Sequence, residues 1–249
     1  MRLLEDKVAL ITGAAAGIGA GVAHLFAEQG ARTYILDING AGAQSVRAAI
    51  EAKGGFARAF EGDVRRPETI APAVEDAIGL FDRIDILINN AGAFPRQSFL
   101  DMTEAQWDDI QNLNLKGIFH CTKVVLPHML RRGSGKIVNM SSVTFFMGLE
   151  NLSHYIAAKG GIIGFTRALA RELGRNNIHI NCVTPGAIQT EGEQASTPKE
   201  QLAEILKSQC LQRRIVPLDI ARACLFLSSE LSDGMTGQTL NVDGGLVMH

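Results

Sequence analysis

The side chains best suited to chemistry stand together at residues 154–161, HYIAAKGG, where Tyr155 and Lys159 lie four positions apart. On a helix this spacing puts a phenol and an amine on one face, about one turn apart. Taken alone, the spacing fits two interpretations. The residues could be a catalytic pair, or a tyrosine packed in the core beside a lysine whose ammonium group reaches solvent. The elements and motifs around the pair must decide between the two.

A catalytic role has a clear physical basis. A free phenol has a pKa near ~10 and is a poor base at neutral pH. At an effective dielectric constant near 20, an ammonium about 4 Å away contributes about 4 kcal/mol, roughly three pKa units before desolvation subtracts some. Tyr155 could then take the proton of an alcohol, and in reverse protonate a forming alkoxide.

The pair lies in a chain of alternating strand-like and helix-like segments. Apolar runs such as VALIT and IDILI are apolar on both faces, which is typical of central strands in a parallel sheet. We predict a single-domain α/β fold with a doubly wound, mostly seven-stranded parallel sheet of Rossmann type. The expected strands are Val8–Thr12, Thr33–Asp37, Ala57–Phe60, Ile84–Ile88, Lys136–Met140, Ile178–Val183 and Thr239–Val242. The expected helices are Ile18–Gln29, Gly42–Ala52, Thr69–Leu80, Glu104–Leu130, Tyr155–Leu173 and Leu218–Ser228.

Composition excludes several classes of protein. The 249 residues are 46% hydrophobic and 20% charged, with a net charge of -2, so no basic excess points to nucleic acid or an anionic membrane. Acidic residues interrupt the N-terminal apolar run before a signal peptide could form, and no stretch reaches the ~18 apolar residues of a membrane span. The four cysteines are scattered without metal-ligand spacing, so we expect free thiols, no metal and a cytoplasmic location.

A glycine-rich turn follows the first strand. Gly13, Gly17 and Gly19 precede or open the first helix, where glycines let the backbone approach a pyrophosphate and free amides face it. The second strand ends at Asp37, 18 residues past Gly19, where a carboxylate can accept ribose hydroxyls. It would repel a 2′-phosphate by about 4 kcal/mol at ~4 Å, and Ala14–Ala16 supply no compensating cation. These residues predict NAD rather than NADP.

Further motifs make a family resemblance specific. The turn reads TGAAAGIG at 12–19, and it is followed by NNAG at 89–92, NLKG at 114–117, Ser142 thirteen residues before Tyr155, YxxxK at 155–159 and PG at 185–186. In this order they resemble the classical short-chain dehydrogenase/reductase (SDR) family over essentially the whole chain. Within that family, the sequence is locally similar to pyridoxal 4-dehydrogenase and phenylethanol-type secondary alcohol dehydrogenases. It is also similar to 3-oxoacyl-carrier-protein reductases, which usually prefer NADPH.

The resemblance implies a role for each matching residue. Tyr155 would be the general acid/base, Lys159 would bind the nicotinamide ribose and lower the tyrosine pKa, and Ser142 would bind the substrate oxygen. Asn114 would hold a water that links Lys159 to solvent. Asp63 and the Val64 amide would flank the adenine, and Ile188 and Thr190 would meet the carboxamide. The complete set implied for the cofactor is Gly13, Gly17, Ile18, Gly19, Asp37, Asp63, Val64, Asn90, Gly92, Tyr155, Lys159, Pro185, Gly186, Ile188 and Thr190.

Two local choices stay open at this point. Ser141 and Ser142 are adjacent, and only the spacing to Tyr155 favours Ser142. Of Asn89 and Asn90, we expect one to tie the sheet together. His154 points about 100° away from Tyr155, so we interpret it as a packing or pocket-rim residue.

The substrate should meet Ala93–Arg96, Val143–Asn151 and a flap at about 187–214, which we expect to contain an amphipathic helix. Their aromatic and aliphatic residues, among them Phe145 and Phe146, favour a ring or alkyl ketone over a highly charged sugar phosphate. The function predicted is an NAD-dependent oxidoreductase acting on a secondary alcohol, or cyclic hemiacetal, and its ketone. The alternatives are a 3-oxoacyl-carrier-protein reductase-like ketoreductase and a non-catalytic dinucleotide-binding sensor. The resemblance also implies a homotetramer, in which His249 could help close a neighbour's pocket.

Overall fold

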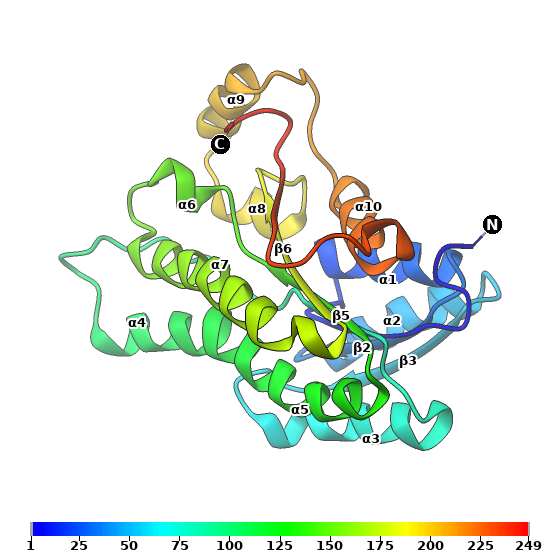
Figure 1. Ribbon diagram of the computed structural model, residues 1–249. Helices are drawn as coiled ribbons and strands as arrows, with labels where there is room; N and C mark the ends of the chain where they lie inside the picture. Colours follow the sequence, from blue (N-terminus) through cyan, green and yellow to red (C-terminus); the bar gives the residue numbers. More distant parts are fainter. Residues whose placement is uncertain (1, 249) are drawn as a thin grey trace.

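The computed structural model describes residues 2–248, without the side chains of residues 195, 196 and 199 (Figure 1). Seven strands form one all-parallel sheet in the order β3-β2-β1-β4-β5-β6-β7. This confirms the predicted doubly wound α/β fold and all seven strands, with small shifts at their ends. The strands are β1 (Val8–Thr12), β2 (Arg32–Asp37), β3 (Phe56–Glu61), β4 (Ile86–Asn89), β5 (Gly135–Met140), β6 (Ile178–Pro185) and β7 (Thr239–Val242).

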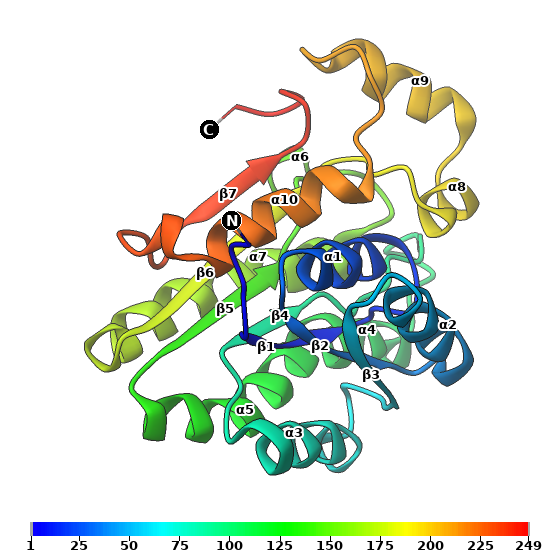
Figure 2. The ribbon, with the colours of Figure 1, turned by 90° about the vertical axis from the view of Figure 1, so that its right-hand side faces the viewer.

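Helices cover both faces of the sheet, as Figure 2 shows. One face carries α1 (Gly17–Glu28), α2 (Gly40–Glu51) and α10 (Pro217–Ser228), and the other carries α3 (Pro67–Phe81), α5 (Gly117–Arg132) and α7 (Ser153–Leu173). Because both faces are covered, every residue of β1 is buried, and this explains its unbroken apolar sequence.

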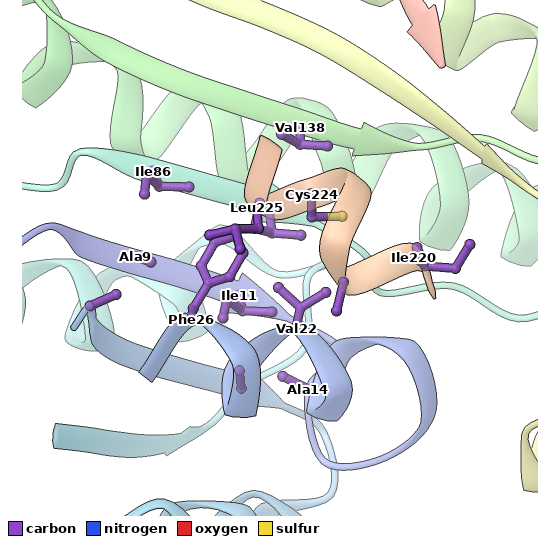
Figure 3. Packing of buried hydrophobic residues seen from close by; sticks show 14 of the residues in the cluster. Ala9, Ile11, Ala14, Val22, Phe26, Ile86, Val138, Ile220, Cys224 and Leu225 are labelled. Carbon is purple, nitrogen blue, oxygen red and sulfur yellow. The ribbon is translucent and has the colours of Figure 1, made fainter. Parts of the chain in front are cut away.

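The core between α1, α10 and the sheet fixes the glycine turn in place. Figure 3 shows Val22 and Phe26 of α1 facing Ile220 and Cys224 of α10 over Ile11 of β1. All five residues are fully buried. Burial of an aliphatic or aromatic side chain contributes about 1.5–3 kcal/mol, so this cluster anchors the start of α1 to the end of β1.

The sheet order reverses between β1 and β4. The helices that follow these two strands lie on opposite faces, which leaves a crevice at the carboxyl ends of the strands. The glycine turn follows β1, NNAG follows β4, and Ser142 follows β5. The fold thus brings these separate motifs to one edge of the sheet.

The single helix predicted over 104–130 is wrong in detail. It is divided into α4 (Glu104–Gln111), a π-helical turn (Asn112–Lys116) and α5. A π turn inserts one extra residue and changes the direction of the side chains around it. Apolar periodicity continues through this stretch, so the sequence pattern carried no sign of the break.

The flap segment at 187–214 contains α8 (Glu191–Ser196) and α9 (Lys199–Ser208). In Figures 1 and 2 both helices stand beyond the carboxyl edge of the sheet. The amphipathic helix expected in this segment corresponds to α9, whereas α8 and the short α6 (Thr144–Met147) were not predicted. None of the described helices is long and apolar enough to cross a lipid bilayer.

Candidate active site

A cavity of about 810 Å³ opens at the carboxyl edge of the sheet. It runs from the glycine turn, past the Tyr155 helix, to the flap and the segment after β7. Of the residues assigned from the sequence, its wall includes Gly17, Ile18, Asn90, Gly92, Asn114, Ser142, Tyr155, Lys159, Pro185, Gly186, Ile188 and Thr190.

Tyr155 and Lys159 lie on one face of α7, as the spacing predicted. The Lys159 ammonium is 5.3 Å from the centroid of the Tyr155 ring and donates a 2.8 Å hydrogen bond to the Met140 carbonyl. Lys159 is only 4% exposed. The Phe94 ring lies 5.9 Å from the Tyr155 ring, centroid to centroid, so the phenol has both a cation and an aromatic ring as neighbours.

The pKa values of the pair differ from the sequence expectation. Burial raises the pKa of Tyr155 to about 12, and a hydrogen bond with Ser142 only partly opposes this. Burial lowers the pKa of Lys159 to about 8. The expected lowering of the Tyr155 pKa by Lys159 is therefore absent from this structure. The physical reason is that the ammonium is directed at the Met140 carbonyl, and that desolvation disfavours both charged forms.

Asn114 lies in the π-helical turn and is fully buried. Its side-chain amide donates to the Ala93 and Ile110 carbonyls, at 3.0 and 3.2 Å, while its Oδ1 atom has no partner among the described residues. A Cβ placed on Gly92 would lie 2.6 Å from that Oδ1 atom and 3.6 Å from Lys159 Nζ. The unused acceptor and the buried ammonium thus face one small space beside Gly92.

The structure separates the two serines that the sequence left open. Ser141 Oγ donates a 2.7 Å hydrogen bond to the Lys159 carbonyl and so ties β5 to α7. Ser142 Oγ accepts from the Thr144 amide at 3.2 Å and its side chain also bonds with Tyr155. Ser142 is therefore the serine that stands beside the phenol.

The glycine turn is held by β4. The Thr12 hydroxyl accepts hydrogen bonds from the Asn90 and Ala91 amides, and the Asn90 side chain donates to the Thr12 and Gly13 carbonyls at 3.0 and 2.9 Å. Gly13 has φ of +64°, and a Cβ there would lie 2.6 Å from the Ala91 Cα atom. Only glycine fits this position.

Three other motif residues, Asn89, Gly19 and Gly186, have structural roles. Asn89 binds Asn139 and Thr122, so it is the asparagine that ties the sheet together. A Cβ on Gly19 would lie 2.6 Å from the Asn90 amide nitrogen, and a Cβ on Gly186 would lie 2.7 Å from the Asp243 Cβ. These two glycines allow close packing at either end of the cavity.

Asp37 lies beside the glycine turn. Its carboxylate accepts hydrogen bonds from the Ala15 amide at 2.9 Å and from the Asn39 amide at 2.8 Å. No Lys or Arg stands at Ala14–Ala16, so its charge is compensated only by backbone dipoles there. Asp37 is not part of the cavity wall.

Asp63 and Val64 also lie outside the cavity wall. The Arg65 guanidinium binds the Asp63 carboxylate at 2.7 Å and holds its pKa below the usual range. The Val64 carbonyl contacts His120 Nδ1 at 2.9 Å. The structure does not bring Asp63 and Val64 together with the catalytic residues, so the adenine-binding role assigned to them stays a prediction.

The segment after β6 closes the cavity from the flap side. Ile188 is buried and pairs with Ile215 in an isolated parallel bridge. Thr190 caps α8 through a 3.1 Å hydrogen bond from the Glu193 amide, and its methyl group lies 3.4 Å from the place of a Cβ on Gly17. This segment therefore bridges the glycine turn and the flap.

The substrate end of the cavity differs from the prediction in part. Phe145 and Phe146 do not line it; their rings meet edge to face, and Phe145 packs beside Gly160 of α7. Leu246, in the segment after β7, does line it and was missed, because no local pattern links residue 246 to the flap. The side chains gathered at this end are Phe94, Arg96, Met147, Leu149, Leu152, Gln201, Ile205 and Leu246.

His154 is buried outside the cavity wall, so it is a packing residue. His249, proposed to close a neighbour's pocket, lies outside the described residues. Among the described residues, no cluster of His, Cys, Asp and Glu side chains could hold a metal ion.

Comparisons with known proteins agree on the type of enzyme. A family model described as enoyl-(acyl carrier protein) reductase matches residues 13–247. A probable galactose dehydrogenase of Rhizobium meliloti is 38% identical over 98% of this chain and 96% of its own length. A 3-oxoacyl-[acyl-carrier-protein] reductase of Thermotoga maritima is 38% identical over 98% and 99%, and a D-xylose 1-dehydrogenase of Caulobacter vibrioides is 39% identical over 97% and 96%. The chain therefore belongs to the classical short-chain dehydrogenase/reductase family, whose oxidoreductases use a nicotinamide dinucleotide.

Proposed function

We propose that the protein is an NAD-dependent oxidoreductase that interconverts a secondary alcohol, or a cyclic hemiacetal, and its carbonyl product. One observation carries the proposal: Ser142, Tyr155 and Lys159 converge in a cavity that begins at the glycine turn. The phenol that can transfer a proton and the turn that can bind a pyrophosphate therefore share one cavity.

The side chains divide the work on the substrate. The Ser142 hydroxyl, which already accepts from Thr144, keeps its own proton to donate to the substrate oxygen and so positions that oxygen beside Tyr155. In oxidation the Tyr155 phenolate takes the hydroxyl proton and becomes the neutral phenol, and in reduction the phenol gives this proton to the oxygen. Lys159 supplies positive charge beside the phenolate, and Asn114 Oδ1 offers an acceptor for a water that hydrates Lys159.

The residues of the crevice fit a nicotinamide dinucleotide, which when bound exchanges a hydride with the substrate carbon. Gly13 and Gly17 have positive φ angles at the start of α1, so the turn exposes helix N-terminal amides to the pyrophosphate. The Asp37 carboxylate, with no cation at Ala14–Ala16, supports NAD over NADP. The named reductase relatives make NADP the alternative that the test must include.

Two substrate classes follow from the relatives. The galactose and xylose dehydrogenases favour a sugar-like cyclic hemiacetal, and the polar Arg96 and Gln201 at the substrate end can bind hydroxyl groups. The second candidate is reduction of a 3-oxoacyl group, favoured by the carrier-protein reductases and by Phe94, Met147 and Ile205.

A matched screen tests the proposal. The purified protein is assayed with NAD and NADP against aldoses, aromatic and alicyclic secondary alcohols and pyridoxal-type alcohols, and in reverse with a 3-oxoacyl thioester. We expect NAD-linked oxidation of one alcohol class. Clear NADP preference contradicts the Asp37 argument, and binding of NAD without turnover of any substrate favours the sensor alternative.

We also propose a cytoplasmic homotetramer. Cys121, Cys182 and Cys224 are buried free thiols, which suits a reducing compartment. Phe119 on α5 and Leu231 after α10 are exposed apolar side chains available to neighbouring subunits. Light scattering should give a mass near four times 26.8 kDa, and a mass of one chain would contradict the assembly.

A further inference from the structure

Glu193 is a buried carboxylate in the cavity wall that the proposed reaction does not use. The residue is only 6% exposed, although the neighbouring Glu191 and Gly192 are exposed. It lies in the first turn of α8, and its amide is fixed by the Thr190 hydroxyl. A buried carboxylate needs hydrogen-bond partners for both oxygens, because an unmade bond leaves its desolvation uncompensated.

Only one oxygen of this carboxylate is partnered. Glu193 Oε1 accepts a hydrogen bond from the guanidinium of Arg214, the last residue of the flap. Glu193 Oε2 is buried and has no hydrogen-bond partner among the described residues. The side chain does not turn back to the start of its own helix, as the glutamate of a capping box would. Glu193 therefore has one hydrogen-bond acceptor, Oε2, that is available to a ligand in the cavity.

The position of Glu193 limits which ligand group can reach it. Thr190, three residues earlier, contacts the place of a Cβ on Gly17 at the glycine turn. Tyr155 lines the same cavity. A dinucleotide whose pyrophosphate lies at the turn must place its nicotinamide ring between the turn and Tyr155, since hydride passes to the carbon that bears the Tyr155-bound oxygen. The segment from Ile188 to Glu193 lines the same cavity and approaches the glycine turn through Thr190.

We propose that Glu193 Oε2 accepts a hydrogen bond from the amino group of the nicotinamide carboxamide. Arg214 holds the other carboxylate oxygen and so fixes which way the free oxygen points. Glu193 thereby selects the orientation of the ring. This inference rests on the proposed function, because it requires a bound nicotinamide dinucleotide.

Glu193→Gln gives a sharp test. Arg214 can only donate, so the glutamine oxygen must face it, and the glutamine N–H₂ group then stands where Oε2 stood. A donor would meet the donor of the carboxamide. We expect the Kd for NAD, measured by calorimetry without substrate, to rise about tenfold. The Kd for 3-acetylpyridine adenine dinucleotide, in which a methyl group replaces the amino group, should change less than about twofold.

Glu204→Gln is the matched control. It removes the same charge from the flap, on the exposed side of α9 and outside the cavity wall, so neither Kd should change. If Glu193→Gln does not fold, Glu193→Asp keeps the charge beside Arg214 but withdraws the oxygen by one methylene. We expect it to weaken NAD binding about threefold while sparing the analogue.

Equal weakening of both dinucleotides would overturn the inference, because the ion pair would then act only through the shape of the flap. Unchanged binding of both would also overturn it, and a rise confined to the substrate KM would identify a substrate hydroxyl as the partner instead. Failure of the wild-type protein to bind either dinucleotide would overturn the proposed function itself, which separates the two failures.

Discussion

The two walls of the cavity are built in different ways. On one side, strands, α7 and the π-helical turn position the sheet-end residues Asn114, Ser142, Tyr155 and Lys159, together with Asp37, which lies outside the wall at the end of β2. Asn114, Ser142 and Lys159 are buried, and each bonds to protein atoms of the core. Such residues cannot shift without disturbing the core, so this wall suits steps that need fixed geometry.

On the other side, the flap meets the rest of the protein through a few contacts among described residues. They include the Ile188–Ile215 bridge, the Glu193–Arg214 ion pair and a 2.7 Å hydrogen bond from Arg96 to Gln201. Most of α9 is exposed or half-buried. From this comparison we infer that the sheet-end residues carry out the reaction and choose between NAD and NADP, whereas the flap holds the substrate and, through Glu193, the nicotinamide.

Among the tests of this comparison, the largest effect is expected where the sheet-end residues choose the dinucleotide. Asp37→Asn removes the charge but keeps an acceptor for the Ala15 amide. The full repulsion of about 4 kcal/mol is reduced by solvent, so we expect the ratio of kcat/KM for NAD to that for NADP to fall about a hundredfold.

Glu61→Gln is the control for this substitution. Glu61 stands opposite Asp37 on β3 and is exposed, so its loss should change the ratio only a few fold. If Asp37→Asn leaves the ratio unchanged, the cofactor is chosen elsewhere, and the division between the two walls fails.

The second test asks whether the Lys159 ammonium is desolvated by burial in the folded protein. Its folded pKa of about 8 lies below the usual 10.5, so between these values the unfolded chain binds more protons than the folded protein. Stability should therefore rise with pH across this window. Relative to Lys159→Met, the wild-type free energy of unfolding should increase by about 2 kcal/mol between pH 7 and pH 10.

Urea unfolding at a series of pH values measures this difference directly. Because the comparison is between pH values, it is unaffected by the hydrogen bond to Met140 that the substitution also removes. A difference that stays constant with pH would mean that the ammonium is well solvated, and that this side of the cavity is less rigid than the burial of Lys159 indicates.

The smallest effect concerns the flap. Gln201→Ala removes a side chain that lines the cavity and bonds to Arg96, so the substrate KM should rise about threefold with kcat unchanged. Lys207→Ala, on the same helix but paired with Glu204 in solvent, should change neither constant. A tenfold fall in kcat for Gln201→Ala would show that the flap takes part in the chemical step.

The contrast between the sheet-end residues and the flap also explains which features the sequence could predict. Strands such as β1 and β7 have the predicted bounds, because apolar runs between turn residues report burial directly. The spacing of Tyr155 and Lys159 also suffices to put both on one helix face. By contrast, the π-helical turn around Asn114 leaves the apolar periodicity intact, so nothing local distinguishes it from an ordinary helix.

Contacts between distant segments lay beyond the sequence. Leu246 reaches the cavity through the turn after β7, where the Asp243 carboxylate accepts from the Gly245 and Val247 amides. The pairing of Glu193 with Arg214 depends on how the flap folds over itself. The Tyr155 pKa was misjudged for a similar reason, since desolvation and the direction of the Lys159 ammonium are properties of the packed core.

The central claim is that Tyr155 transfers the proton. Tyr155→Phe keeps the ring beside Phe94 and removes only the hydroxyl, so it can be measured with the best substrate of the screen and with NAD. We expect turnover to fall by about a thousandfold or more while the Kd for NAD stays within about twofold of wild type. Retention of full turnover in this variant would contradict the account.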